Sequence, residues 1–248
     1  MGIFKTLFKS EPKLPPADLS ALHTDVHSHL IPGIDDGAKT MDESINMIRE
    51  LHLLGYKKLI TTPHIMCDHQ KNTKEGILWG LQKLREAVKK EDIPIDLESA
   101  AEYYADFDLE AKIEQNDLLT FGDNYVLFEL SFLNLPENLG RIIFKLHTSG
   151  YKPVIAHVER YAYWHNNFNA YRQLKDADVL FQLNIPSLAG YYSPQIKKAA
   201  ERLIDDDMIE LLGTDCHSMN YIEFIKSSLT KKSLRKVLSS GKLLNNTL

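Results

Sequence analysis

The chain has 248 residues, a formal net charge of −5 and an apolar fraction of 44%. These values are ordinary for a soluble globular protein of one large domain or two small ones, and they give no sign of a nucleic-acid partner. No apolar run is long enough to cross a membrane. Cys67 and Cys216 are too few for a disulfide framework, so we expect two reduced thiols in a cytoplasmic protein.

The first twenty residues have the character of an extension. Met1–Lys9 is short and basic with apolar positions at helical spacing, and it lacks the apolar core and cleavage site of a signal peptide. We predict an extension and linker over residues 1–20 and a single domain over residues 21–248. The extension is expected to be a loose tail or a helix packed on the domain. Contact with a membrane surface or with a partner is the alternative.

From residue 21 on, short β-rich runs alternate with segments of helical periodicity. The expected strands are Leu22–Val26, Lys58–Thr62, Ile95–Ala100, Tyr125–Leu130, Pro153–Ala156, Val179–Leu183 and Ile209–Gly213. The expected helices are Met41–Leu54, Thr73–Lys90, Leu139–Ser149, Pro194–Asp206 and Ser233–Ser240. This alternation implies an α/β fold with parallel strands and helical crossovers. Seven strands fit either a distorted barrel or a doubly wound sheet.

Histidine or a carboxylate stands at the C-terminal end of six of these seven expected strands. In a parallel barrel, that end carries the loops that build active sites. Imidazole and carboxylate together suit borderline divalent ions such as Zn²⁺, Mn²⁺ and Fe²⁺. The candidate ligands, in chain order, are His27, His29, His64, Glu102, Glu129, His157, Asp215 and His217.

Each piece taken alone has a simpler explanation. A single His-x-His, such as the one at residues 27–29, is usually incidental. Glu129 lies between two apolar residues and could be neutralised by Arg or Lys instead of a metal. Asp35 and Asp36 are either ligands or residues of a turn. Only the joint placement at successive strand ends predicts a metal centre.

These residues resemble the polymerase and histidinol phosphatase (PHP) superfamily, and within it the capsule-type bacterial protein-tyrosine phosphatases, which depend on manganese. The resemblance runs from about Thr24 to the end of the chain. It is carried by Asp25-Val26-His27-Ser28-His29, Asp35-Asp36-Gly37, Thr62-Pro63-His64, Ala101-Glu102-Tyr103-Tyr104, Ile155-Ala156-His157-Val158-Glu159-Arg160 and Thr214-Asp215-Cys216-His217. It implies a distorted (β/α)₇ TIM-like barrel with three divalent metal ions, expected to be Mn²⁺, with Fe or Zn as alternatives.

The resemblance also assigns roles to single residues. It implies a first metal held by His27, His29, Glu102 and Asp215, a second bridged by Glu102 and held by Glu129 and His157, and a third held by Asp36, His64 and His217. Arg160, Glu102 and Asp215 are the expected catalytic group, with Arg160 on the phosphate. An ion pair between Arg160 and Glu159 or a surface carboxylate is the alternative. Tyr161 and Tyr163 are candidates for an aromatic rim around the substrate, with ordinary packing as the alternative.

The implied reaction is hydrolysis of a phosphate monoester by a metal-bound hydroxide, and the resemblance favours protein phosphotyrosine as the substrate. The implied partner is a tyrosine-phosphorylated tail of a membrane-bound polysaccharide-chain regulator or kinase, in the control of capsular or exopolysaccharide synthesis. This places the protein in the cytoplasm or at the inner membrane face. Monomer and oligomer both remain alternatives. A small-molecule phosphatase of the histidinol-phosphate type and a non-catalytic module that binds a phosphorylated tail are the alternatives.

The chain departs from the capsule-type pattern at two places. Basic residues expected just after His64 are replaced by Ile65-Met66-Cys67-Asp68-His69, where His69 or Lys71 is a candidate substitute. The arginine expected a few residues after His217 is absent from residues 218–222. Both departures concern the binding of phosphate rather than the metal ligands.

Overall fold

Parallel strands form the centre of the molecule, and their order in space is their order along the chain. The computed structural model describes residues 14–248, so the helix expected at Met1–Lys9 lies outside the described residues. The strands are β1 (Thr24–Asp25), β2 (Lys58–Thr61), β3 (His64–Ile65), β4 (Asp96–Ser99), β5 (Glu102–Tyr104), β6 (Tyr125–Glu129), β7 (Lys152–Ile155), β8 (Leu180–Asn184) and β9 (Leu211–Gly213).

Two of the seven expected strands, Lys58–Thr62 and Ile95–Ala100, are each followed by a second short strand that was not predicted. β3 continues β2, and β5 continues β4, because the register that pairs Thr61 with Ser99 is the one that pairs His64 with Glu102. Pro63 lies at the break and has no amide hydrogen to donate to the ladder. The nine short strands therefore occupy seven positions, and all seven expected strands are present.

The sheet closes on itself between β9 and β1. Ser28 pairs in parallel with Cys216, and the amide of Asp215 donates to the carbonyl of His27 at 2.7 Å. The amide of His29 donates in turn to the carbonyl of Cys216 at 3.0 Å. The predicted distorted (β/α)₇ barrel is confirmed, because a doubly wound sheet would leave both edges open.

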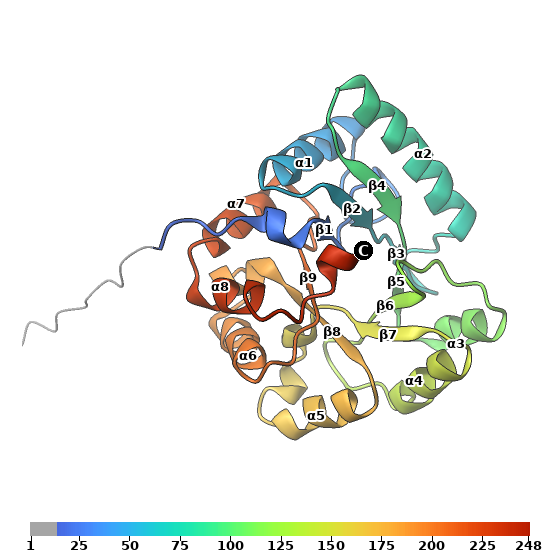
Figure 1. Ribbon diagram of the computed structural model, residues 1–248. Coiled ribbons are helices and arrows are strands. Elements are labelled where there is room, and N and C mark those ends of the chain that lie inside the picture. Colours follow the sequence, from blue (N-terminus) through green and yellow to red (C-terminus); the bar gives the residue numbers. More distant parts are fainter. Residues whose placement is uncertain (1–13) are drawn as a thin grey trace, which may run out of the picture.

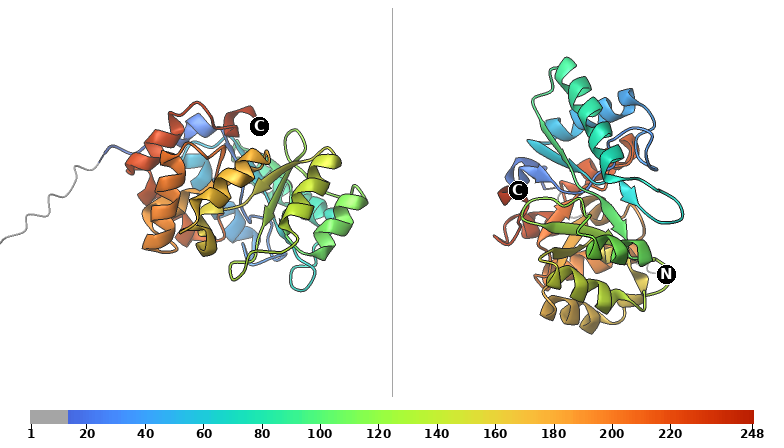
Figure 2. Two further views of the ribbon diagram at one scale, coloured as in Figure 1. Left: turned by 90° about the horizontal axis from the view of Figure 1, so that it is seen from below. Right: turned by 90° about the vertical axis from the view of Figure 1, so that its right-hand side faces the viewer.

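Within the described part of the chain, eight α-helices lie outside the strands (Figures 1 and 2). They are α1 (Met41–Leu53), α2 (Lys74–Lys90), α3 (Phe107–Glu114), α4 (Leu139–Thr148), α5 (Phe168–Asp176), α6 (Pro194–Asp205), α7 (Met219–Ser228) and α8 (Lys232–Leu238). The five predicted helices are found with ends shifted by one or two residues, whereas α3, α5 and α7 were not predicted. Within residues 14–248, no helix combines the length and apolarity needed to cross a bilayer.

Glu110 ties α3 to α4. Its carboxylate accepts hydrogen bonds from Asn138, Arg141 and Lys145 at 2.7 to 2.9 Å, although it is only 8% exposed. The Arg141 hydrogen bonds contribute most to lowering the pKa of Glu110, to about 2. This buried carboxylate is fully paired and therefore needs no metal.

A small apolar cluster fills the barrel interior. Successive strands contribute Ile60, Leu127, Val154 and Leu211, among others. At the N-terminal end of the strands, Asn245 of the short helix η5 (Asn245–Thr247) joins β1 to β9. Its amide donates to the carbonyls of Thr24 (2.9 Å) and Leu212 (2.8 Å), and its oxygen accepts from the amide of Leu212 (3.0 Å). Figure 1 shows the C-terminus next to β1.

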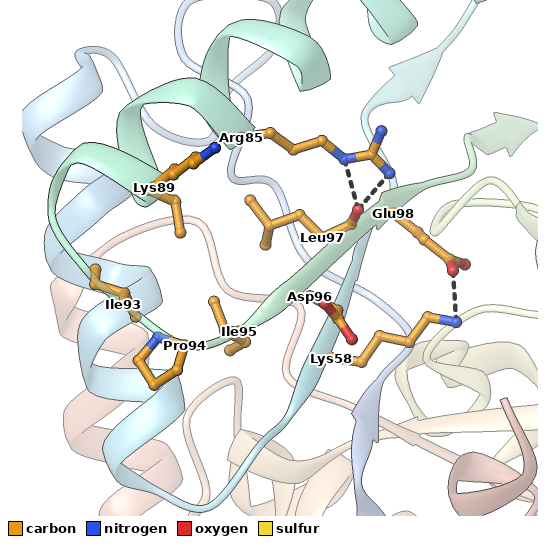
Figure 3. Close-up of a pocket in the computed structure, with 10 residues that line it drawn as sticks. Lys58, Arg85, Lys89, Ile93, Pro94, Ile95, Asp96, Leu97 and Glu98 are labelled. Atoms are coloured by element: carbon orange, nitrogen blue, oxygen red, sulfur yellow. Dashed lines mark hydrogen bonds and ion pairs between the residues drawn. The ribbon is translucent and has the colours of Figure 1, made fainter.

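A cavity of about 730 Å³ lies between α2 and β4, at the N-terminal end of β2 and β4 (Figure 3). Arg85 donates two hydrogen bonds to the carbonyl of Leu97 (2.9 and 2.6 Å), and Lys58 forms an ion pair with Glu98 (2.7 Å). β4 is the last strand of its three-stranded sheet. Arg85 thus satisfies a carbonyl that has no strand neighbour, so the basic residues here protect an edge.

Candidate metal centre

All nine predicted metal ligands meet at the C-terminal end of the barrel. They line or border a cavity of about 360 Å³ that Arg160 also lines. Eight of them lie at the last residue of a strand or within four residues after it, with β2 and β4 preceding His64 and Glu102, whereas Asp36 lies in the loop between β1 and α1; the strands converge at this end. Three groups of ligand atoms each lie within 4.8 Å of one another: His27, His29 and Asp215; His64, Glu102 and Glu129; and His29, Asp36, His64 and His217.

The first group agrees with the ligand set expected for the first metal. His27 Nε2 lies 3.1 Å from Glu102 Oε2 and 3.3 Å from Asp215 Oδ1. His29 Nε2 lies 3.4 and 3.5 Å from the same two oxygens. Two imidazole nitrogens and two carboxylate oxygens therefore face one point, and all four side chains are buried.

Glu102 faces a second group with its other oxygen. His157 Nε2 lies 3.0 Å from Glu102 Oε1 and 3.6 Å from Glu129 Oε2, as the bridging arrangement requires. His64 adds to this group, because its Nδ1 lies 3.2 Å from Glu102 and 3.3 Å from Glu129. Glu129 has no Arg or Lys partner among the ion pairs of the described residues, so the salt-bridge explanation for it is not supported.

The third group selects between the two neighbouring aspartates. Asp36 Oδ1 lies 3.5 Å from His64 Nε2 and 3.4 Å from His217 Nε2. Asp35 Oδ2 instead accepts a hydrogen bond from His29 Nδ1 at 2.8 Å. Asp36 is therefore placed as a ligand, whereas Asp35 orients one.

His27, His29 and His217 are each held by Nδ1, the ring nitrogen opposite the Nε2 that faces the candidate centre. His27 Nδ1 donates to Gln182 Oε1 at 2.8 Å, and His217 Nδ1 donates to the backbone carbonyl of Asp215 at 2.8 Å. With Asp35 on His29, these partners fix the tautomer that presents Nε2 to the centre. Such outer partners are typical of metal-bound histidine.

β8, the strand without a predicted ligand, supplies outer partners instead. Gln182 Nε2 donates to Asn184 Oδ1 at 2.9 Å, and Asn184 Nδ2 donates to Asp215 Oδ2 at 2.7 Å. Tyr192 also donates to Asp215 Oδ2, at 2.9 Å. None of these three residues was predicted from the sequence. A glutamine in the middle of an apolar strand, with an asparagine at its end, was the available signal.

The electrostatics of the centre favour a bound cation. Burial opposes protonation of His27, yet Glu102 and Asp215 raise its pKa to about 9. Burial likewise opposes ionisation of Glu102 and Asp215, yet the surrounding histidines hold both carboxyl pKa values well below their usual range. These two buried carboxylates therefore need a neighbouring positive charge to compensate their own. The buried His64 Nδ1 and His157 Nδ1 also have no hydrogen-bond partner, so this donor set fits a divalent ion.

Two ligands have uncommon backbone conformations. His157 has φ of 34° and Asp215 has φ of 51°, in the left-handed region that non-glycine residues rarely adopt. Both residues come directly after a strand or within two residues of its end. The bend turns their side chains into the centre, and strain of this kind gathers at functional sites.

Arg160 points to the metal centre and not to Glu159. Its Nη1 lies 3.4 Å from Asp215 Oδ2, and its guanidinium lies between the rings of Phe132 (4.4 Å) and Tyr192 (4.2 Å). Glu159 is buried elsewhere, where it accepts from the Ser187 hydroxyl at 2.5 Å. The alternative of a Glu159 ion pair is therefore wrong.

The predicted aromatic rim needs correction. Tyr161 is fully buried, and its hydroxyl accepts from the Leu130 amide and donates to the Ala156 carbonyl. Tyr163 stacks on Tyr161 and donates to the Ser131 carbonyl at 3.1 Å. Ordinary packing therefore explains both. The aromatic residues that line the cavity are Phe132, from the loop after β6, and Tyr221 of α7.

The two departures from the expected pattern have structural counterparts. His69 lines the cavity together with Met66 and Gln70, whereas Lys71 is not among the lining residues. Where the arginine after His217 was expected, the ring of Tyr221 stacks on His217, with centroids 5.3 Å apart. An aromatic ring thus occupies the side of the cavity that was expected to be basic.

Comparisons with known proteins agree with this geometry. The sequence profile of the family described as capsular polysaccharide synthesis, CpsB/CapC, matches residues 23–228. The chain is 30% identical to tyrosine-protein phosphatase YwqE of Bacillus subtilis, over 81% of this chain and 79% of that protein. It is 27% identical to tyrosine-protein phosphatase CpsB of Streptococcus pneumoniae, over 79% of this chain and 83% of that protein.

Solved structures give the same picture. One from the study of YwqE and CpsB, described as metal-dependent tyrosine phosphatases, matches with a TM-score of 0.80 and 29% identity, over 91% of this chain and 90% of that one. A lactonase from Listeria monocytogenes shares the fold alone, with a TM-score of 0.53 and 10% identity. The predicted resemblance is confirmed: the chain belongs to the CpsB/CapC family of capsular polysaccharide synthesis.

Proposed function

We propose that this protein is a metal-dependent phosphatase that hydrolyses phosphotyrosine in proteins. The observation that carries the proposal is the convergence of imidazole and carboxylate ligands on one cavity beside the guanidinium of Arg160. Such a cavity suits a dianionic phosphate ester and the charge that develops on it. The relatives of this chain bear the name tyrosine-protein phosphatase, which supports the same substrate class.

The proposed ligand assignment is the one that the family resemblance implies. His27, His29, Glu102 and Asp215 would hold one ion, Glu102, Glu129 and His157 a second, and Asp36, His64 and His217 a third. We propose Mn²⁺, with Fe or Zn as the alternatives, because the mixed nitrogen and oxygen donors suit such ions. When bound, the ions supply activated water and neutralise phosphate oxygens.

The protein's own residues hold the reacting groups in place. Glu102 presents one oxygen to each of two ligand groups and so fixes the distance between them. Asp215 presents Oδ1 to the first group and Oδ2 to Arg160. Arg160 has a side chain 22% exposed, so its guanidinium can reach a phosphate in the cavity while Asp215 and two rings hold it.

The proposed physiological substrate is a phosphotyrosine-bearing tail of a membrane-bound regulator or kinase of capsular or exopolysaccharide synthesis. Membership of a family described by capsular polysaccharide synthesis supports the process. The proposal places the enzyme in the cytoplasm, close to the inner membrane face.

The test is turnover of a chromogenic aryl phosphate and of phosphotyrosyl and phosphoseryl peptides, with histidinol phosphate alongside, across Mn²⁺, Zn²⁺ and Fe²⁺. We expect hydrolysis of the aryl phosphate and the phosphotyrosyl peptides, and an Arg160→Lys variant with a raised KM. If the metal-loaded protein hydrolysed none of these substrates, the proposed phosphatase activity would be refuted. Preference for histidinol phosphate would refute the substrate class alone.

A further inference from the structure

Tyr192 touches both halves of the proposed machinery. It lies between the short helix η4 (Ile185–Ala189) and α6. Its hydroxyl donates to Asp215 Oδ2 at 2.9 Å and accepts from Asn184 Nδ2 at 2.9 Å. Its ring lies 4.2 Å from the guanidinium carbon of Arg160. One side chain therefore contacts a proposed metal ligand through its hydroxyl and the proposed phosphate-binding residue through its ring.

The two carboxylate oxygens of Asp215 have different partners. Oδ1 lies 3.3 Å from His27 Nε2 and 3.5 Å from His29 Nε2, on the side of the metal ligands. Oδ2 accepts from Tyr192 and Asn184 and faces Arg160. Because Oδ2 is occupied by fixed donors, the carboxylate keeps the rotation that aims Oδ1 at the metal.

The ring holds Arg160 from one face while Phe132 holds it from the other, at 4.2 and 4.4 Å. A free arginine side chain loses rotamer entropy when it is ordered. A guanidinium already fixed between two rings loses less of this freedom when it meets phosphate.

Tyr192 belongs to an aromatic group that lies where the expected second arginine is absent. The ring of Tyr191 lies 4.9 Å from Tyr192, 4.6 Å from Tyr221 and 4.8 Å from Phe224. Tyr221 in turn stacks on His217. This side of the cavity is therefore formed by aromatic rings, without the expected second arginine. Phosphate binding then depends more strongly on the position of Arg160.

We propose that Tyr192 is a positioning residue: its hydroxyl sets the orientation of Asp215 for metal binding, and its ring fixes Arg160 for phosphate binding. The proposal rests on the proposed function for its second half only. Two variants separate the halves, because Tyr192→Phe removes the hydroxyl alone, whereas Tyr192→Leu removes the ring as well.

The test measures Mn²⁺ binding by equilibrium dialysis and KM for an aryl phosphate. We expect Tyr192→Phe to weaken Mn²⁺ binding about tenfold and to leave KM within about twofold at saturating metal. We expect Tyr192→Leu to weaken Mn²⁺ similarly and to raise KM about fivefold further. Tyr171→Phe is the matched control, because the buried hydroxyl of Tyr171 has no hydrogen-bond partner among the described residues.

Wild-type Mn²⁺ affinity in a folded Tyr192→Phe would overturn the first half, and equal KM values in the two variants would overturn the second. Thermal unfolding shows whether each variant is folded. The dialysis arm needs no turnover, so it stands even if the aryl phosphate is not a substrate and the proposed function fails.

A second observation, independent of Tyr192, is a neighbouring cavity of about 520 Å³. It shares Asp36 and His217 with the metal cavity, so the two spaces adjoin. Apart from Gly37 and these two shared residues, it is lined by the polar or charged Lys39, Glu43, Ser218 and Asn220 and by two methionines: Met47, which is buried, and Met219, which is 41% exposed. Flexible thioether side chains adapt to apolar groups of different shape.

We infer that this cavity receives an apolar side chain that flanks the phosphotyrosine of the substrate. A group in this place must be linked to the phosphoester over a short distance, which a neighbouring residue of a peptide satisfies. The inference deepens the proposed function, and it predicts a preference that a small aryl phosphate cannot show.

The test compares the wild type and one variant, Met219→Ala, on a set of matched substrates. Phosphotyrosyl peptides carry leucine, glycine or aspartate at each position within two residues of the phosphotyrosine. We expect the variant to lower kcat/KM about fivefold for the best leucine peptide, and less than about twofold for the glycine peptide and an aryl phosphate. Equal effects on leucine and glycine peptides, or a wild-type preference for aspartate, would overturn the inference. A wild type that cleaves the aryl phosphate but no peptide would refute the proposed substrate class instead.

Discussion

The neighbouring carboxylates Asp35 and Asp36 give the sharpest test of the metal centre. Asp36 is placed to act as a ligand, whereas Asp35 is the hydrogen-bond partner of another candidate ligand, His29. Asp36 Oδ1 faces His64 and His217 at 3.5 and 3.4 Å, and its side chain is 60% exposed. Asp35 has a side chain 1% exposed and accepts from His29 Nδ1 at 2.8 Å and from the Gly37 amide at 2.9 Å. Replacing each aspartate singly therefore removes different things.

Asp36→Ala deletes a ligand, so we expect it to bind one ion fewer per chain. Asp35→Asn keeps the shape and an acceptor oxygen but loses the negative charge beside His29. Loss of such an outer partner weakens metal binding by about 10- to 100-fold, which is about 1.4 to 2.8 kcal/mol. Asp35→Asn should therefore bind the full number of ions at high metal concentration, but with lower affinity.

The assay is metal counting by mass spectrometry after dialysis, followed by titration against a competing chelator. Thermal unfolding of each apo variant serves as the control for folding. If Asp35→Asn lost an ion at saturating metal while Asp36→Ala kept all of them, the assignment of the two aspartates would be reversed and the reasoning refuted.

Other predictions concern stability and metal dependence. Glu110→Gln should destabilise the fold by about 1–2 kcal/mol at neutral pH in urea unfolding, whereas the exposed Glu114→Gln should cost less. Because folding lowers the pKa of Glu110 to about 2, this stability is present above about pH 4.5 and disappears as the pH falls towards 2; a difference from wild type that persists at pH 2 would contradict it. Gly37→Ala should lower metal affinity and thermal stability, because a Cβ there would lie 2.3 Å from the His29 carbonyl oxygen, whereas Gly140→Ala in α4, with nothing within 4 Å, should be neutral or stabilising. Chelation should abolish turnover and lower the Tm, with recovery on adding Mn²⁺; an unchanged Tm would show that the metals do not stabilise the fold.

Eight of the nine candidate metal ligands could be predicted from the sequence because each lies close to a strand end, whereas Asp36 lies in the loop before α1 and was selected only by the family resemblance. Hydrophobic runs locate the strands, and parallel strands bring their ends together without further information. The roles of Tyr192 and Tyr161 could not be read in this way. The turn that follows His157, with φ of 34°, directs Tyr161 into the core although it is next to Arg160 in sequence. Tyr192 reaches Asp215 only through the arrangement of two loops.

The helices that were missed have a similar explanation. α3, α5 and α7 have 8 to 10 residues, and their apolar faces are short. Isolated helices of this length are marginal, so packing against the barrel determines them more than periodicity does. Asp106 could have indicated the start of α3, because its side chain accepts from the amides of Asp108 and Leu109.

The bonds of Asn245 to β1 and β9 have a consequence for the order in which the protein becomes functional. The ribosome makes His27 early and His217 late, and Asn245 follows both. Before Asn245 has been made, a nascent chain lacks the hydrogen bonds by which this residue joins β1 to β9. Because the ligands that follow β1 and β9 come from distant parts of the chain, we expect the full set of ions to bind only after nearly all of the chain has been made.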